Sequence, residues 1–298
     1  MNKLLLYLTI FFVLSCNNSE TKESNGEKKS AVDTAIAQTN HADYDLSKPE
    51  KFLMPDALNE VSGIAFYKGN KETLYGEQDE DGKLYYLHPG DKKATHVKFG
   101  KKGDYEDLAI VNDRVVILRS DGTLFSFPFN EVNQEEITNV KEWKDLLPAG
   151  EFEGLYGDEA DNKLYVLCKQ CDNDKTSEAV SAYILQLQPD GNIIRSGNAS
   201  INVKAIDDLA GKKKIKFNPS ALAKNPKTQQ WYIISSTNNM LVIADNTWNV
   251  KEVHRLDPSL FRQPEGIAFD SENNLYISNE GDVISRGNVL KFAYKPNQ

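Results

Sequence analysis

Three glutamates at equivalent positions of an internal repeat are the residues of this chain best placed to do chemistry. Each is followed by a small or acidic residue and then by Leu or Ile, as Glu106-Asp-Leu, Glu153-Gly-Leu and Glu265-Gly-Ile. Two further repeats begin with serine, at Ser62-Gly-Ile and Ser220-Ala-Leu. Three carboxylates that converge on an axis repel one another, and something must neutralise them at neutral pH. We predict a Ca²⁺ site at Glu106, Glu153 and Glu265, because Ca²⁺ accepts about six to eight oxygen ligands in flexible geometry.

The repeat itself indicates which elements hold these residues. The spacings between successive repeat starts are 44, 47, 67 and 45 residues, and about 40–50 residues make one four-stranded propeller blade. Within the second repeat, strands are expected at 108–111, 115–118 and 123–127, with a tight hairpin at Ser120-Asp121-Gly122. An Asp-Gly pair between two β-rich runs is a strong hairpin signal. The fold predicted is an all-β propeller of five to six four-stranded blades.

Closure of the ring is also predicted. The last repeat ends after its third strand, near residues 288–294, while an extended stretch at 44–54 precedes the first repeat. We expect this N-terminal strand to complete the last blade, so that no sheet edge stays exposed. The long spacing contains an excess at 203–216, which is either an excursion or a degenerate sixth blade.

Propeller geometry extends the candidate site beyond the three glutamates. The start of strand one and the end of strand two lie on the same rim of the central channel, because the two strands are antiparallel. The ligand-binding residues predicted on or near this rim are Glu60, Glu77, Asp79, Arg119, Lys169, Asn279 and Glu280. Pairing of the carboxylates with Arg119 and Lys169 is the alternative to a bound cation, and a solvated rim without a ligand is the plainest reading.

Other catalytic chemistry finds little support, and no catalytic residue is identified. The four histidines are scattered, without metal-ligand spacing. Cys168-Lys-Gln-Cys171 could suggest redox or metal chemistry, but it ends a predicted strand in a chain with an export signal. A local disulfide between Cys168 and Cys171 is the preferred interpretation.

The N-terminal region predicts export and anchoring. Residues 1–16 combine one lysine, an apolar run from Leu4 to Leu14 and a final Ser-Cys, the layout of a secretory signal. Val13-Leu14-Ser15-Cys16 resembles a bacterial lipobox, so we predict lipidation of Cys16 and a stable membrane anchor in the cell envelope, at the outer membrane. Residues 17–43 have almost no large apolar side chains and are predicted to be a disordered tether, followed by a single propeller domain at 44–298. The net charge of −9 argues against nucleic acid as a partner.

The amino-acid sequence of the repeats resembles that of the SdiA-regulated protein family. The matching phrases are Glu60-Val-Ser-Gly-Ile-Ala, Gly103-Asp-Tyr-Glu-Asp-Leu-Ala, Leu118-Arg-Ser-Asp-Gly-Thr-Leu, Phe152-Glu-Gly-Leu, Asn218-Pro-Ser-Ala-Leu, and Gln263-Pro-Glu-Gly-Ile-Ala-Phe-Asp with Ile277-Ser-Asn-Glu-Gly. The resemblance implies a propeller tied to the bacterial envelope and carries no established reaction.

Two classes of function follow. The first is an envelope lipoprotein that binds a ligand or partner protein on the polar rim together with Ca²⁺, and the sequence favours this non-enzymatic class. The second is a metal-dependent hydrolase, lactonase-like or phosphoesterase-like, that uses the axial carboxylates.

Overall fold

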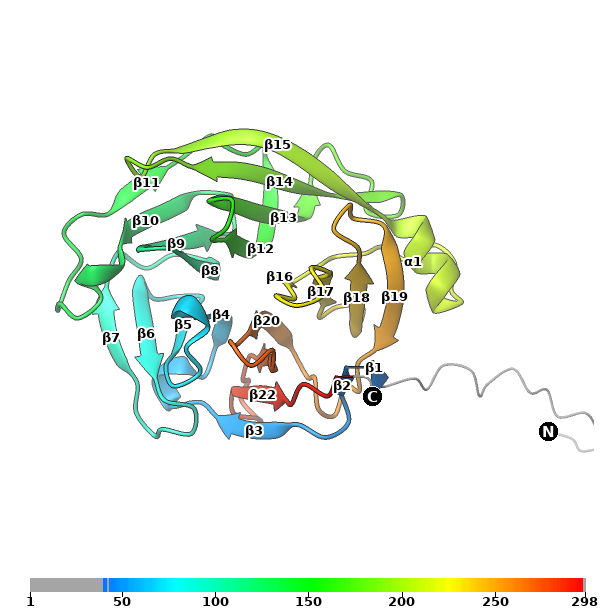
Figure 1. The fold of residues 1–298 in the computed structure, drawn as a ribbon, viewed down its shortest axis with the longest axis horizontal. Helices are drawn as coiled ribbons and strands as arrows, with labels where there is room; N and C mark the ends of the chain where they lie inside the picture. Colours follow the sequence, from blue (N-terminus) through cyan, green and yellow to red (C-terminus); the bar gives the residue numbers. More distant parts are fainter. Residues whose placement is uncertain (1–39, 42, 297–298) are drawn as a thin grey trace, which may run out of the picture. The chain divides into compact units, whose positions relative to one another are not determined.

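The computed structural model describes residues 40–41 and 43–296, and in this part five four-stranded antiparallel sheets are arranged around a common axis (Figure 1). The innermost strands of successive sheets contact one another all the way around the ring, from β4 to β8, β12, β16, β20 and back to β4. The fold is therefore a five-bladed β-propeller, at the lower end of the predicted range of five to six blades.

The first two blades follow each other along the chain. Blade 1 contains β4 (Val61–Phe66), β5 (Leu74–Gln78), β6 (Lys83–Leu87) and β7 (Thr95–Lys98). Blade 2 contains β8 (Tyr105–Val111), β9 (Arg114–Arg119), β10 (Leu124–Pro128) and β11 (Lys141–Trp143). In blade 2, Leu118 pairs with Leu124 across the predicted hairpin, which confirms the strands expected there.

The next two blades differ in strand length. Blade 3 contains β12 (Gly150–Asp158), β13 (Lys163–Cys171), β14 (Ala179–Leu187) and β15 (Ile193–Asn202), the longest strands of the ring. Blade 4 contains β16 (Ala221–Lys224), β17 (Trp231–Ser235), β18 (Met240–Ala244) and β19 (Val250–Arg255).

The excess residues between these two blades form a short helix and a loop rather than a sixth blade. Helix α1 (Val203–Ala210) begins at Asn202, whose side chain accepts a hydrogen bond from the Ala205 backbone N–H, and ends at Gly211 in the left-handed conformation. Its Val203 and Ile206 side chains are buried. The predicted excursion is therefore correct, and the degenerate blade is not.

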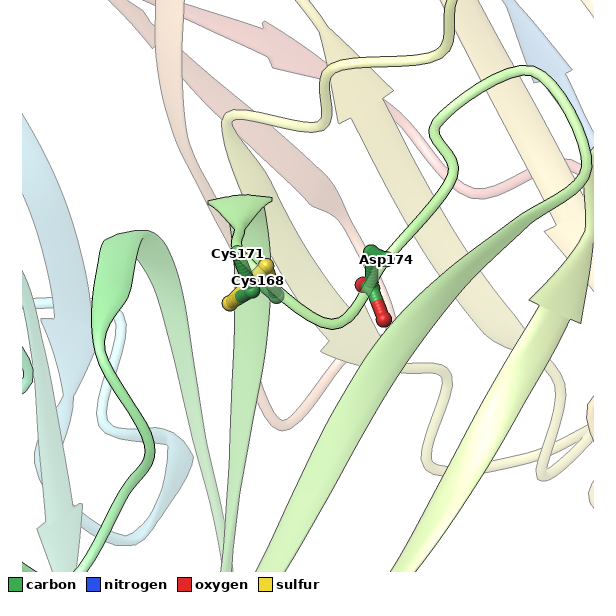
Figure 2. A group of neighbouring side chains, drawn as sticks. All are labelled: Cys168, Cys171 and Asp174. Carbon is green, nitrogen blue, oxygen red and sulfur yellow. A yellow bond between two sulfur atoms is a disulfide. The ribbon is translucent and has the colours of Figure 1, made fainter.

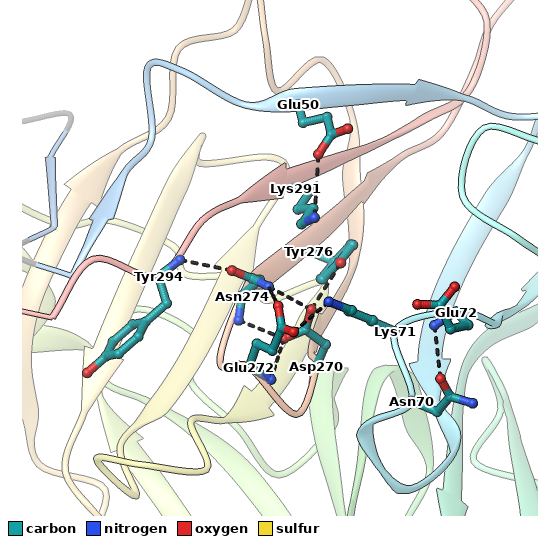
Figure 3. A network of polar contacts seen from close by, with 10 residues as sticks. All are labelled: Glu50, Asn70, Lys71, Glu72, Asp270, Glu272, Asn274, Tyr276, Lys291 and Tyr294. Carbon is teal, nitrogen blue, oxygen red and sulfur yellow. Dashed lines mark hydrogen bonds and ion pairs between the residues drawn. The ribbon is translucent and has the colours of Figure 1, made fainter.

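Blade 5 joins the two ends of the propeller. It contains β20 (Pro264–Phe269), β21 (Leu275–Asn279) and β22 (Asn288–Phe292), and its outer strand is β3 (Glu50–Leu53) from the N-terminal side. The register runs from Asn288 opposite Leu53 to Lys291 opposite Glu50, and the last pair also forms an ion pair of 3.4 Å (Figure 3). The predicted closure is confirmed, because a strand distant in sequence removes the open sheet edge.

The remaining elements are short. Strands β1 (Asn40–His41) and β2 (Tyr44–Asp45) pair with each other, and three 3₁₀ turns lie at η1 (Asp56–Leu58), η2 (Tyr67–Gly69) and η3 (Phe129–Glu131). The predicted tether at 17–43 therefore contains two paired residues at its end. The predicted signal segment, the lipidated Cys16 and most of the tether lie outside the described residues. No helix in the described part of the chain is both long and apolar enough to cross a membrane.

Apolar side chains of neighbouring blades pack against one another between the sheets. Between blades 3 and 4, for example, Trp231 stacks on Trp248 with ring centroids 4.4 Å apart, and Tyr165 contacts both rings. This packing fixes the five inner strands around the axis and so positions the candidate site at their ends.

Candidate functional site

Each of the three predicted glutamates is the extra residue of a β-bulge at the start of the inner strand. In blade 2, Tyr105 pairs with Arg119 and Asp107 with Leu118, which leaves Glu106 between them without a partner residue. The same shift leaves Glu153 unpaired in blade 3 and Glu265 unpaired in blade 5. A bulge of this kind re-aims one side chain out of the regular alternation of a strand. We call the end of the channel that carries Glu106, Glu153 and Glu265 the glutamate rim.

Lys169 and Ser220 connect the glutamates across blades 3, 4 and 5. The register of blade 3 shifts a second time, so that Lys169 is left unpaired on β13 and its ammonium group contacts the Glu153 carboxylate. The Ser220 hydroxyl, at the equivalent start of blade 4, hydrogen-bonds with both Glu153 and Glu265. The predicted convergence of Glu153, Glu265 and Lys169 is therefore seen in the structure.

The glutamates influence one another's protonation. Burial, followed by the charge of Glu153, raises the pKa of Glu106 to about 9 and that of Glu265 to about 8. Burial also raises the pKa of Glu153, which is 8% exposed, while the contact with Lys169 opposes this rise. Among the described residues, the only salt bridge to any of the three is the one from Lys169 to Glu153. Glu106 and Glu265 thus have no salt-bridge partner in the described chain.

A second acidic group lies next to the first, at the junction of blades 5 and 1. Burial, followed by the charge of Asp79, raises the pKa of Glu280 to about 7. Burial and then the charge of Glu60 raise the pKa of Asp79, and one Asp79 carboxylate oxygen is buried without a hydrogen-bond partner. Glu280 accepts a hydrogen bond from the Gln263 amide. The described residues form no salt bridge to Glu60, Asp79 or Glu280, so these predicted residues add carboxyl groups without a basic partner to this end of the channel.

Two other predicted ligand-binding residues serve the fold instead. Glu77 is fully buried and accepts a hydrogen bond of 2.7 Å from the Gly63 backbone N–H, which the blade 1 bulge directs toward it. Asn279 is also fully buried, and its amide group donates to Asn288 at 3.1 Å and to the Leu260 carbonyl at 3.3 Å. Neither side chain reaches the open rim.

Arg119 does not neutralise the glutamates. Its guanidinium group forms a two-pronged ion pair with Asp121, at 3.0 and 2.7 Å, and donates to Thr123 at 3.1 Å. Asp121 lies two residues away on the same hairpin and is therefore the nearer partner. The interpretation that paired Arg119 with the axial carboxylates is wrong, whereas the corresponding one for Lys169 and Glu153 is correct.

Asp107 is a buried acid that the repeat alignment alone does not explain. The other repeats have Gly or Ala at this position, but Asp107 is 4% exposed and its carboxylate accepts hydrogen bonds from the Leu155 N–H at 2.6 Å and the Leu108 N–H at 2.8 Å. Its side chain therefore ties blade 2 to blade 3 directly beneath the glutamate rim. Burial raises the pKa of Asp107.

Cys168 and Cys171 form a disulfide beside the rim, with Cα atoms 6.0 Å apart (Figure 2). The pair encloses Lys169, and Asp174 follows on the next loop. In residues 40–41 and 43–296, one group of at least three His, Cys, Asp or Glu residues has all its ligand atoms within 4.8 Å of one another. This group is Cys168, Cys171 and Asp174. Because both sulfurs are bonded to each other, the group offers no thiolate ligand to a metal.

The donor chemistry of the glutamate rim fits a hard cation. All its donors are oxygens, most of its carboxyl groups have no basic partner in the described chain, and the Asp79 oxygen without a partner is a ready ligand. The carboxylate oxygens of Glu106, Glu153 and Glu265 are not all within 4.8 Å of one another, with Lys169 in contact with one of them. A bound cation would therefore draw these side chains together and displace Lys169.

The opposite end of the channel holds a cavity of about 460 Å³ that the sequence analysis did not predict. It is lined by the far ends of the inner strands and the turns that follow them, including Tyr156, Asp158 and Lys224. A signal was present, because Tyr156 occupies a repeat position that is alanine in the other four blades, at 65, 109, 223 and 268. An alignment restricted to charged residues passes over this position.

A closed five-bladed β-propeller with an acidic rim is thus the class of protein that the fold and the site define. The sequence profile of the SdiA-regulated family matches residues 37–284, and the chain belongs to that family. A comparison with curated proteins finds no match.

Solved structures show the same fold at low sequence identity. The chain is similar to a Myxococcus xanthus glutaminyl cyclase, with 14% identity, a TM-score of 0.54 and coverage of 83% of this chain and 94% of that one. It is similar to a luciferin-regenerating enzyme, with 11% identity, a TM-score of 0.52 and coverage of 83% and 95%. It is also similar to the calcium-binding protein regucalcin from Agrobacterium tumefaciens, with 12% identity, a TM-score of 0.52 and coverage of 82% and 93%. At these identities the likeness concerns the fold alone.

Proposed function

We propose that this chain is a non-enzymatic binding propeller of the cell envelope, which takes up a divalent cation, Ca²⁺ in the first instance, on its glutamate rim and binds a ligand or partner protein there. The observation that carries the proposal is the set of three bulged glutamates, from three different blades, of which only Glu153 contacts a lysine in the described chain. A bulge at the same place in three repeats aims three carboxyl groups at one axis, where burial and then the charge of Glu153 raise the pKa values of Glu106 and Glu265.

The cation would be held by Glu106, Glu153 and Glu265, with the Ser220 hydroxyl between the last two. The bound charge would stabilise the ionised carboxylates and release Lys169 to face solvent or an anionic group of the ligand. Ca²⁺ is the first choice because it tolerates an irregular oxygen shell. The calcium binding named for the similar regucalcin is a further reason to test it first.

Attachment to the envelope is the second part of the proposal and rests on the sequence. Lipidation of Cys16 would anchor the chain in the membrane, and residues 17–43 would hold the propeller away from the bilayer surface. Metabolic labelling with a palmitate analogue tests this part, with Cys16→Ser as the control that should lose the label and the membrane association.

A metal-dependent hydrolase is the second candidate, and one observation favours it. Glu106 and Glu265 have pKa values of about 9 and about 8, which suits a general acid that operates near neutral pH. Turnover of lactones or phosphoesters that depends on Ca²⁺ and is lost in Glu265→Gln would favour this candidate. Metal binding without turnover favours the binding protein.

The direct test is thermal unfolding of the purified protein with and without Ca²⁺. A cation that binds only the folded chain raises the melting temperature. We expect stabilisation of the unmodified protein, loss of that stabilisation in Glu153→Gln, and retention in Arg119→Gln, because Arg119 is paired with Asp121. Equal melting temperatures with Ca²⁺ and with a chelator would contradict the proposal.

A further inference from the structure

The cavity at the end of the channel opposite the glutamate rim has two unlike walls. It is bounded by the distal halves of all five inner strands and by the β12–β13, β16–β17 and β20–β21 turns. Its volume of about 460 Å³ lies within the usual range for small-molecule sites, about 300–1,000 Å³. We call this end of the channel the alanine mouth.

The first wall is apolar and built from small side chains. Four blades contribute alanine at the same repeat position, and Phe269 and Ile110 lie beside them. The four alanines are Ala65, Ala109, Ala223 and Ala268. Small residues at four of the five positions leave space near the axis, and their methyl groups offer no hydrogen bond to a guest.

The second wall is polar and lies at the junction of blades 3 and 4. Tyr156 and Asp158 are two residues apart on β12, and Lys224 of β16 contacts the Asp158 carboxylate at 3.3 Å. The Tyr156 ring is held edge-on against Trp231, with centroids 5.4 Å apart. These packing contacts fix the orientation of the polar groups before any ligand arrives.

This wall has more hydrogen-bond donors than acceptors available. The half-buried Lys224 ammonium group has three N–H donors and, within the described chain, one hydrogen bond, to Asp158. Asp158 itself also accepts the Ala160 N–H at 3.1 Å. Tyr156 lines the cavity, and its hydroxyl forms no hydrogen bond with any residue the structure describes. The unused capacity is therefore that of an ammonium and a phenol, which suits an anionic acceptor.

The cavity is also lined by the exposed Glu159 and by Asp270 on the β20–β21 turn, and the hydrogen-bond acceptors of Asp270 are already occupied. Asp270 accepts hydrogen bonds from the Glu272 and Asn274 backbone, from the Asn274 amide group and from the Tyr276 hydroxyl, and Figure 3 shows these side chains turned toward it. Because both Asp270 oxygens are occupied, this residue does not create a site for a cationic ligand.

We propose that the alanine mouth binds a small monocarboxylate with an apolar body. The carboxylate accepts hydrogen bonds from Lys224 and Tyr156, and the body lies against the alanine wall and Phe269. Three lysines line the cavity, but Lys68 pairs with Asp113 at 3.5 Å and the Lys227 ammonium group lies over the Tyr294 ring, 4.2 Å from its centroid. The one ammonium group on the polar wall, that of Lys224 with Asp158 close by, favours one negative charge over the two of a phosphate monoester. This site is separate from the glutamate rim and does not depend on the function proposed there.

The test is isothermal titration of the purified protein with octanoate and phenylacetate, compared with octanol and octylamine. We expect the carboxylates to bind at least about tenfold more tightly than octanol, and octylamine not to bind. Lys224→Met should weaken octanoate binding by about tenfold, and Tyr156→Phe by a smaller factor. Lys51→Met, an exposed lysine on the outer strand β3, is the matched control and should leave binding unchanged.

The outcomes separate cleanly. Equal binding of octanoate and octanol, unchanged binding in Lys224→Met, or no binding of either carboxylate at about 1 mM would overturn the proposal. Glu153→Gln should leave octanoate binding intact whether or not the glutamate rim binds Ca²⁺. The proposal for the alanine mouth and the proposal for the glutamate rim can therefore be contradicted independently.

Discussion

The two ends of the channel are built from the same five inner strands but have opposite chemistry. At the glutamate rim the strands carry bulges, which turn Glu106, Glu153 and Glu265 out of the strand alternation and toward the axis. At the alanine mouth the pairing of inner and second strands is regular, and four of the five equivalent positions are alanine. The bulges therefore determine which side chains turn toward the axis at the glutamate rim.

Charge compensation differs just as clearly. Six carboxyl groups lie at or next to the rim, those of Glu60, Asp79, Glu106, Glu153, Glu265 and Glu280. In the described chain, only Glu153 among them contacts a lysine. At the mouth, Asp158 has its own partner in Lys224, and Asp270 is hydrogen-bonded on both oxygens. The rim therefore needs protons or a cation, whereas at the mouth the two buried carboxylates already have partners and the Lys224 ammonium group has N–H donors available for a ligand.

The largest effect is expected from a substitution beneath the rim. A Cβ at Gly63 would lie 2.7 Å from the Asp107 Cα and 2.8 Å from the Leu108 backbone nitrogen, and backbone atoms cannot move aside cheaply. Gly63→Ala should lower the free energy of unfolding by roughly 3 kcal/mol, measured by urea denaturation. Gly197→Ala on β15, where the nearest atom is 3.8 Å away, is the control and should be close to neutral. Equal effects would show that the blades are not packed this tightly.

Removal of the Asp107 carboxylate should lower the free energy of unfolding by somewhat less than Gly63→Ala does. Asp107→Ala leaves the buried Leu108 and Leu155 N–H groups without an acceptor, which should destabilise the protein by roughly 2–3 kcal/mol in the same assay. Asp113→Ala, at an exposed carboxylate on the turn after β8, is a suitable comparison. A loss below that of Asp113→Ala would contradict the role of Asp107 in joining blades 2 and 3.

The pH dependence of stability should report the charge imbalance of the rim. Glu106 and Glu265 have pKa values of about 9 and about 8 in the folded chain, above the ordinary value of 4.5. Between those values the folded protein binds more protons than the unfolded one, so the free energy of unfolding should fall as the pH rises from about 4.5 to about 9. Glu106→Gln should reduce this fall in the free energy of unfolding. Stability that rises with pH over this interval would contradict the assignment.

The smallest predicted effect distinguishes the two basic residues. Lys169→Met removes a positive charge that competes with the cation, so Ca²⁺ affinity should rise by about three- to tenfold. Arg119→Met should not change it, because Arg119 is paired with Asp121. Calorimetric titration measures both. A weaker affinity in Lys169→Met would mean that the lysine supports the site rather than competing for it.

Much of the fold could be predicted because it depends on repetition. The spacing of the repeat starts predicts the blades, and the missing fourth strand of the last repeat predicts the closure by β3. Glu153 and Lys169 could be brought together because their places in the repeat are equivalent to rim positions. These inferences need only the period of the chain and the antiparallel order of the strands.

The details that could not be predicted depend on local competition. Arg119 binds Asp121 because that carboxylate is two residues away, and repeat equivalence does not reveal so near a partner. Glu77 is enclosed because the bulge at Ser62 and Gly63 presents an N–H to it. The polar wall of the alanine mouth depends on the packing of Tyr156 against Trp231, which are distant in sequence.

The most direct measurement of the central claim is calorimetric titration of the protein with Ca²⁺ at pH 8, in two buffers that differ in ionisation enthalpy. Because Glu106 and Glu265 hold protons near this pH, binding should release protons and the observed heat should differ between the buffers. The same titration of Glu153→Gln should show greatly weakened binding. The absence of a binding isotherm, or binding that is unchanged in Glu153→Gln, would contradict a cation site on the glutamate rim.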